Sequence, residues 1–138
     1  MSRVVTCNGC FDGLHPGHLF FLGFCRGQGD ELIVGINTDE YIRTHKRPDP
    51  VPEEDRVRAL MSLGVVSRVE VFPENTPIGF LRRTRPDVNC IGEEYRDVAP
   101  ELPVCRELGI EVVYIPRIGD WSSTGLRKGT YAGVGKGI

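Results

Sequence analysis

Hydrophobic positions along the chain alternate between short runs with strand character and longer segments with helical spacing. Five runs rich in β-branched and aliphatic residues predict strands over residues 3–7, 31–37, 68–72, 88–91 and 111–115. The second run is continuously apolar, as expected of a strand covered on both faces. Between the runs, apolar spacing and turn residues predict helices over residues 15–26, from 38 onward, 52–63, 77–84, 99–108 and 122–128.

Strands that alternate with helices in this way indicate an α/β fold. We expect a Rossmann-like open five-stranded parallel sheet with right-handed crossovers and helices on both faces. Residues 1–128 form one predicted domain, and residues 129–138 are a glycine-rich tail. Since ligands of such sheets bind beyond the carboxyl ends of the strands, the turn after the first strand is the first place to look for a site.

Composition narrows the class of protein. The 138 residues are 40% hydrophobic and 26% charged, which is typical of a globular domain. A net charge of −2 gives no general surface for nucleic acid, so an anion site must be local. No apolar run approaches the roughly 20 residues that span a bilayer, and no signal-peptide pattern opens the chain. We therefore expect a cytoplasmic protein without membrane contact, and five free thiols: Cys7, Cys10, Cys25, Cys90 and Cys105.

The turn after the first strand carries two histidines, His15 and His18, at a predicted helix start. A spacing of three residues puts both rings on one face of the helix. Free backbone N–H groups and the positive end of the helix dipole face the same space, and Gly17 leaves room for a ligand. We expect Gly9 to allow close backbone approach or a positive φ. The turn therefore predicts a polyphosphate site in which two imidazoles with pKa values near neutrality donate hydrogen bonds.

These residues carry a family resemblance. Gly9-x-Phe11-Asp12-x-x-His15-x-Gly17-His18 is similar to the GxFDxxHxGH signature of the cytidylyltransferase-like nucleotidyltransferases, with all six fixed positions present. The resemblance extends over residues 3–128. It implies that His15, His18 and Arg117 are catalytic. It also implies nucleotide-binding roles for Gly9, Cys10, Phe11, Asp12, Gly17, Gly92, Glu94, Trp121, Ser122, Ser123 and Thr124.

The second signature lies near the C-terminus. Three consecutive hydroxyl residues, 122–124, at a helix start most often serve only as a cap. Beside a complete histidine motif they resemble the second triphosphate motif of the family. Arg117 lies where glycerol-3-phosphate cytidylyltransferases carry an arginine.

Three further basic residues have two interpretations each. By resemblance, Lys46, Arg47 and Arg56 contact the phosphate of the acceptor. Lys46 and Arg47 are also consistent with solvated loop charges, and Arg56 is equally consistent with a surface arginine that pairs with Glu53 at i,i+3.

Two branches of the family compete. The match around residues 39–56, together with Arg117, slightly favours CTP and an acceptor such as glycerol 3-phosphate. In contrast, Asn8-Gly9-Cys10-Phe11-Asp12, Asn75-Thr76-Pro77 and Arg85-Pro86-Asp87 resemble the adenylyltransferase domain of ADP-heptose synthesis, which uses ATP and a heptose 1-phosphate. Glu94 stands where the family usually has an aspartate beside the base or ribose.

The resemblance implies a specific reaction. An acceptor phosphate attacks the α-phosphorus of a nucleoside triphosphate and releases pyrophosphate, with Mg²⁺ bridging the phosphates. The attacking phosphate is largely a dianion at pH 7, so no general base is needed. Asp12 either orients the turn or contacts the metal. By resemblance to the family, we also expect a homodimer.

Two other classes of function remain open from sequence. The Cys7-x-x-Cys10 pair allows a thiol-redox protein, and a nucleotide-binding regulator without turnover is the second alternative. A dinucleotide-dependent oxidoreductase is disfavoured because no GxGxxG follows the first strand.

Overall fold

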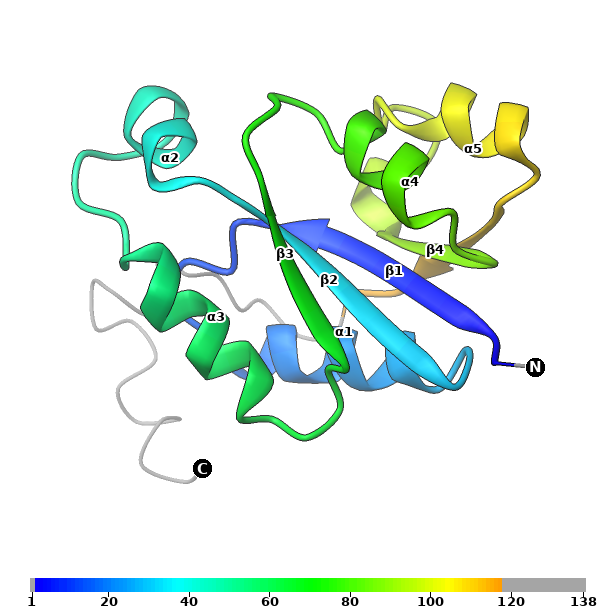
Figure 1. The fold of residues 1–138 in the computed structure, drawn as a ribbon, viewed down its shortest axis with the longest axis horizontal. Coiled ribbons are helices and arrows are strands. Elements are labelled where there is room, and N and C mark those ends of the chain that lie inside the picture. Colours follow the sequence, from blue (N-terminus) through cyan, green and yellow to red (C-terminus); the bar gives the residue numbers. More distant parts are fainter. Residues whose placement is uncertain (1, 118–138) are drawn as a thin grey trace.

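A single parallel sheet organises the protein. The structure, a computed structural model, describes residues 2–117. Its strand order is β3-β2-β1-β4-β5, and every neighbouring pair is parallel (Figure 1). The strands are β1 Val4–Gly9, β2 Glu31–Asn37, β3 Arg68–Phe72, β4 Val88–Gly92 and β5 Glu111–Ile115. The order reverses at β1, because the chain first builds β2 and β3 on one side of it and then β4 and β5 on the other.

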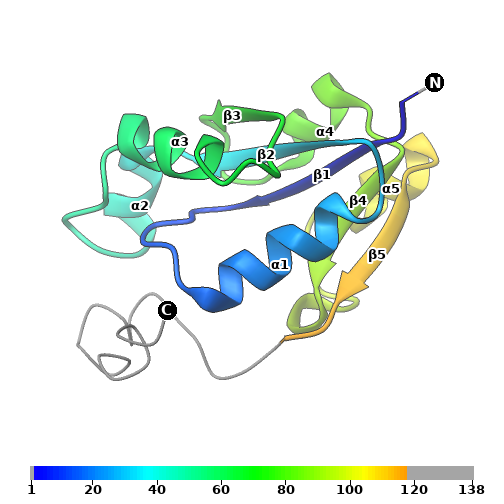
Figure 2. The same ribbon diagram turned by 90° about the horizontal axis from the view of Figure 1, so that it is seen from below.

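Helices cover both faces of the sheet. Figures 1 and 2 show α1 and α3 on one side of the strands and α4 and α5 on the other. The helical segments are α1 Pro16–Arg26, α2 Asp39–His45, α3 Glu53–Met61, α4 Ile78–Thr84, η1 Glu93–Tyr95 and α5 Leu102–Leu108. This arrangement confirms the predicted Rossmann-like class.

Alternate strand residues supply two cores. The core beneath α1 and α3 contains Val5, Cys7, Leu22 and Leu60, all fully buried. The opposite core packs α4 and α5 on the other face of the sheet, with Ile33, Phe80, Leu81, Val104 and Cys105 at its centre. Burial of both faces explains why the run over 31–37 shows no polar alternation.

Most predicted boundaries agree with the structure. Strands β2, β3 and β5 begin and end at the predicted residues, whereas β1 and β4 each extend to a glycine, Gly9 and Gly92. Helix α5 begins at Leu102 rather than residue 99, and the 3₁₀ turn η1 was not predicted. The helix predicted over residues 122–128 and the tail over 129–138 lie outside the described residues.

The prediction that α1 is a buried helix is wrong for its outer half. Only Leu22 and Cys25 are buried on α1, whereas Leu19, Phe20 and Phe24 are 42%, 51% and 41% exposed. The helix carries apolar residues on more than one side, but only one side can face the sheet. Within residues 2–117, no helix is long and apolar enough to cross a lipid bilayer.

Candidate active site

A cavity of about 630 Å³ opens at the carboxyl ends of the strands, around the point where strand order reverses. Residues after β1, β2, β3 and β4 all contribute to it. The predicted site residues that line this cavity are Gly9, Cys10, Phe11, Asp12, His18, Lys46, Arg47, Gly92 and Glu94. Other lining residues that sequence reasoning did not select include Asn8, Asn37, Tyr41, Asn75, Tyr95 and Glu101. Most of these lie at or after the carboxyl ends of strands, which is the signal that would have found them.

The two histidines form a reciprocal cap at the start of α1. The backbone N–H of His15 donates to Nδ1 of His18 at 3.2 Å, and the N–H of His18 donates to Nδ1 of His15 at 3.4 Å. The two rings are stacked, with centroids 3.8 Å apart and planes 25° from parallel. Because both Nδ1 atoms accept hydrogen bonds, a neutral ring carries its proton on Nε2. Each histidine therefore retains one N–H donor for a ligand.

Burial lowers the pKa of both imidazoles. Desolvation and the neighbouring His15 lower the pKa of His18 to about 4. Desolvation, followed by the charge of Arg117, lowers the pKa of His15. The expectation of a pKa near neutrality is therefore wrong for His18 in the ligand-free protein, because a cation is disfavoured in a partly dry site beside a second ring.

Phe11 shapes the floor of the turn. It adopts a positive φ of 47°, and its ring lies against His18 with centroids 5.3 Å apart. A Cβ at Gly9 would come within 3.1 Å of the Phe11 ring, whereas Gly9 itself has no positive φ. Gly9 therefore makes room for the Phe11 ring, and of its two predicted roles the positive φ is wrong, whereas close backbone approach to a ligand stays a prediction.

Asp12 anchors the loop that carries the basic residues. Its Oδ2 accepts from Nε of Arg47 at 2.5 Å, and its Oδ1 accepts from the N–H of Val51 at 2.7 Å. Among the two sequence alternatives for Asp12, this geometry supports orientation of the turn. Arg47 is therefore not a freely solvated loop charge. Its Nη2 is buried and has no hydrogen-bond partner within residues 2–117, while Lys46 is exposed and also lines the cavity.

Arg56 is a structural residue, and both sequence interpretations of it are wrong. Its side chain is 1% exposed, so it cannot reach an incoming phosphate or act as a surface arginine. The guanidinium donates to the carbonyls of Cys10, Asn37 and Val51 at 3.0, 2.7 and 2.8 Å and pairs with Asp39 at 2.7 Å. It thereby ties the ends of β1 and β2 to the loop before α3. Glu53, the expected partner, instead accepts from the N–H of Asp39.

The geometry around Cys10 does not favour a redox role. Cys7 lies inside β1 and is fully buried, whereas Cys10 is half-buried with its Sγ 3.4 Å from Oδ1 of Asn37. Burial raises the pKa of the Cys10 thiol despite the nearby cations. A reactive thiol requires the opposite shift. All five cysteines are free, as predicted.

Of the remaining predicted residues, some belong to the described part of the chain and others lie outside it. Gly92 ends β4, and the carboxylate of Glu94 folds back over it. The charge of Arg117 acts on His15, so the chain after β5 comes near the histidine cap. Gly17 lies in the first turn of α1. Trp121, Ser122, Ser123 and Thr124 lie outside the described residues.

The described side chains do not form a metal centre. Within residues 2–117 no group of three or more histidine, cysteine, aspartate or glutamate side chains is arranged to hold an ion. Asp12, the one predicted candidate, already binds Arg47 and Val51. A magnesium ion therefore does not fit a protein-built site in this part of the chain.

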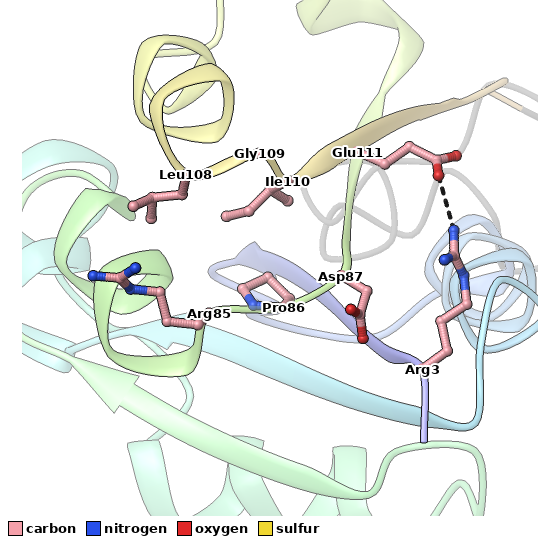
Figure 3. Close-up of a pocket in the computed structure, with 8 residues that line it drawn as sticks. All are labelled: Arg3, Arg85, Pro86, Asp87, Leu108, Gly109, Ile110 and Glu111. Atoms are coloured by element: carbon pink, nitrogen blue, oxygen red, sulfur yellow. Dashed lines mark hydrogen bonds and ion pairs between the residues drawn. The ribbon is translucent and has the colours of Figure 1, made fainter. Parts of the chain in front are cut away.

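A second cavity, of about 510 Å³, lies at the opposite edge of the sheet, where β4 and β5 begin (Figure 3). Arg3 and Glu111 pair at 2.9 Å on one side of it, and Arg85 and Asp87 flank Pro86. Both members of the Arg3–Glu111 pair are about half exposed, and opposite charges balance around the rim. The arrangement offers neither a net charge nor a buried polar group to a ligand.

Comparison with known proteins identifies the class of this architecture. The model of the cytidylyltransferase-like family matches residues 6–127. Among curated relatives, bifunctional protein HldE of Magnetococcus marinus is 35% identical over 91% of this chain and 26% of its own length. HldE of Streptomyces coelicolor is 42% identical over 91% of this chain and 28% of its own length. The chain thus spans about a quarter of the length of these relatives.

Solved structures agree on the fold. A lipopolysaccharide core biosynthesis protein from Thermoplasma volcanium is 27% identical with a TM-score of 0.69, over 88% of this chain and 100% of that one. Pantothenate synthetase from Thermus thermophilus is 18% identical with a TM-score of 0.64, over 90% of this chain and 61% of that one. The second likeness shows a shared fold alone.

Replacing Arg56 with methionine is expected to lower the free energy of unfolding by about 3–5 kcal/mol, because it leaves buried carbonyls and Asp39 without their partner. Urea unfolding measures the change. Arg58→Met on the same helix is the matched control, since that side chain is 71% exposed, and it should change stability by less than about 0.5 kcal/mol. Equal effects of the two substitutions would contradict the structural role of Arg56.

Stability should fall as the pH drops from about 6.5 towards 4. The unfolded chain protonates His18 near its ordinary pKa of 6.5, whereas the folded protein resists until about 4, so acid favours unfolding. Urea midpoints measured from pH 7.5 to 4.5 test this, with His18→Gln as the comparison. The variant should lose less stability than the wild type between pH 6.5 and 5. Parallel curves would show that His18 is not held neutral by the fold.

Proposed function

This chain belongs to the cytidylyltransferase-like family of nucleotidyltransferases, and from that premise we propose that it transfers AMP from ATP to a phosphorylated sugar and releases pyrophosphate. The observation that carries the proposal is the stacked His15–His18 pair, of which His18 lines a cavity large enough for a nucleotide. Pockets of this size commonly hold small ligands and cofactors.

The choice of ATP over CTP rests on the curated relatives and on the structural role of Asp39 and Arg56. The curated relatives favour the adenylyltransferase branch over the glycerol phosphate branch. The sequence-based preference for CTP depended partly on the match over residues 39–56, but the buried Arg56 forms an ion pair with Asp39 that supports the loops. A match there reflects shared architecture rather than a shared acceptor. The neighbour described as a lipopolysaccharide core biosynthesis protein supports a sugar phosphate.

The reaction needs alignment of two anions more than proton transfer. One acceptor phosphate oxygen forms a bond to the α-phosphorus of ATP, and the bond from that phosphorus to the bridging oxygen breaks, so pyrophosphate leaves with the electron pair. Because the attacking phosphate is already a dianion, the absence of a paired general base in the described site is no obstacle. The protein must supply hydrogen-bond donors where negative charge develops.

The histidine cap is suited to that task. Backbone bonds fix each Nδ1, so the Nε2–H of each ring keeps one orientation without a reorganisation cost at the moment of reaction. We assign His18 to the α-phosphate and His15 to the bridging oxygen or the β-phosphate. A neutral ring can donate from Nε2–H to a phosphate oxygen while its Nδ1 continues to accept from the backbone N–H.

Cations complete the proposed phosphate site. Lys46 and the guanidinium of Arg47 would receive the acceptor phosphate, since both residues line the cavity on the β2 side. Arg117, whose charge acts on His15, would hold the outer phosphates together with the hydroxyl residues 122–124. Magnesium would arrive with ATP as the counter-ion of its phosphates. A homodimer is part of the proposal and has no role in these steps.

Replacing either His15 or His18 with alanine should lower kcat/KM by a factor of roughly 10² to 10³, because each change removes one preorganised donor to the transition state. Pyrophosphate release measures the rate, with ATP, CTP, GTP and UTP tested against heptose 1-phosphate, other sugar phosphates and glycerol 3-phosphate. ATP with a sugar phosphate should be the fastest pair.

The third histidine provides the control. His45 lies exposed on α2, outside the cavity, so His45→Ala should leave kcat/KM within about twofold. Nucleotide binding without pyrophosphate release for any acceptor would support the non-catalytic regulator instead. Full activity of the His15 and His18 variants would refute the assigned roles.

A further inference from the structure

Asn37 ends β2 and lines the cavity with an amide side chain. In the pairing of β1 with β2, Gly9 lies opposite Ile36, so Asn37 lies beside Cys10, the first residue of the histidine turn. Asn37 is only 7% exposed. Burial of an amide costs free energy unless its polar atoms find partners, so the partners of each atom indicate what the side chain does.

The carbonyl and the amide oxygen of Asn37 already have partners. The backbone carbonyl accepts from Nη1 of Arg56 at 2.7 Å, and the same Nη1 donates to the carbonyl of Cys10 at 3.0 Å. The Cys10 thiol donates to Oδ1 of Asn37 at 3.4 Å. Because burial raises the pKa of this thiol, it stays protonated and keeps its donor. The thiol therefore fixes which end of the amide faces it.

The amide nitrogen, Nδ2, has no such partner. Within residues 2–117 no atom forms a hydrogen bond with it, and the one bond of the side chain is made by Oδ1. Among partly or fully buried residues of this part of the chain, Nη2 of Arg47 is the one side-chain nitrogen or oxygen that lacks both a partner and contact with solvent. Nδ2 of Asn37 is therefore open to solvent, which its residue meets at the cavity. It offers two N–H donors there.

The charges around this amide favour an anion. Lys46, Arg56 and Arg47 lie close enough for their charges to act on the Cys10 thiol. Asp12 is the carboxylate that also acts there, and it pairs with Arg47. The local charge is therefore positive. A phosphate dianion has only hydrogen-bond acceptors, so it binds where N–H donors and cations lie together.

We propose that Asn37 is a specificity-determining residue for the acceptor, and that its Nδ2–H group donates a hydrogen bond to an oxygen of the acceptor phosphate beside Lys46 and Arg47. This inference rests on the proposed function, because it adds a neutral donor to the acceptor end of the same cavity. A cation attracts a phosphate from any direction, whereas an oriented amide fixes one oxygen and thereby the direction of attack. Cys10 acts through Asn37 as a positioning residue.

Asn37→Asp tests this with little change of shape, because it keeps an oxygen for the Cys10 thiol and replaces the donor with a negative charge. The KM for the sugar phosphate should rise about 10- to 100-fold, the range expected for a lost hydrogen bond to a charged group. The KM for ATP should change by less than about threefold. Gln28→Glu makes the same exchange of amide for carboxylate outside the cavity, so it is the matched control and should leave both KM values within about twofold.

Two variants of Cys10 test the positioning step. Cys10→Ala removes the thiol donor and should raise the KM for the sugar phosphate about 2- to 10-fold, the range of a neutral hydrogen bond. Cys10→Ser keeps a donor and should give a lower KM than the alanine variant. If Asn37 only supported the fold, Asn37→Asp would lower the urea midpoint and kcat and leave the KM for the sugar phosphate unchanged, which would overturn the proposal.

Calorimetric Kd values for heptose 1-phosphate, measured with a non-hydrolysable ATP analogue present, separate this inference from the proposed function. A Kd that Asn37→Asp raises, in a protein that releases no pyrophosphate, would support the role of Asn37 and refute the activity. Pyrophosphate release with a sugar phosphate KM unchanged by Asn37→Asp would support the activity and overturn the role of Asn37. An increase confined to the KM for ATP would overturn it as well, because Nδ2 would then serve the nucleotide.

Discussion

The site depends on the reciprocal hydrogen bonding of His15 and His18. Each ring uses its Nδ1 to cap the backbone N–H of the other residue, and this pairing starts α1, fixes the tautomers and stacks the rings. A helix start normally takes a serine, threonine or aspartate as its cap. Imidazoles perform the same local task here and retain a second nitrogen for another partner. Local structure and phosphate recognition thus use different atoms of the same two side chains.

Charges around the cavity divide between support and binding. Arg56 and Asp39 form hydrogen bonds that join the ends of β1 and β2 to the loop before α3. Asp12 holds that loop through Arg47 and Val51. The supporting charges pair with one another. In contrast, Lys46 forms no ion pair and Nη2 of Arg47 has no hydrogen-bond partner among the described residues. The net charge of −2 is therefore compatible with a local anion site.

The sequence was sufficient for the fold and for the centre of the site. Alternation of apolar runs gave the strands because both faces of the sheet are covered, and the His15–His18 spacing gave the paired rings. Sequence could not assign Arg56, because its burial depends on carbonyls 5 to 46 residues away. Sequence also did not predict that Glu101 lines the cavity, because it looks like an ordinary acidic residue before a helix. The exposed side of α1 escaped prediction since apolar spacing does not reveal which side meets the sheet.

A crystal structure of the protein with a non-hydrolysable ATP analogue tests the central claim most directly. The account predicts phosphate oxygens at about 2.7–3.2 Å from Nε2 of both histidines, with the Nδ1 contacts to the backbone intact. A triphosphate bound elsewhere in the cavity, or rings rotated so that the cap of α1 is broken, would contradict it.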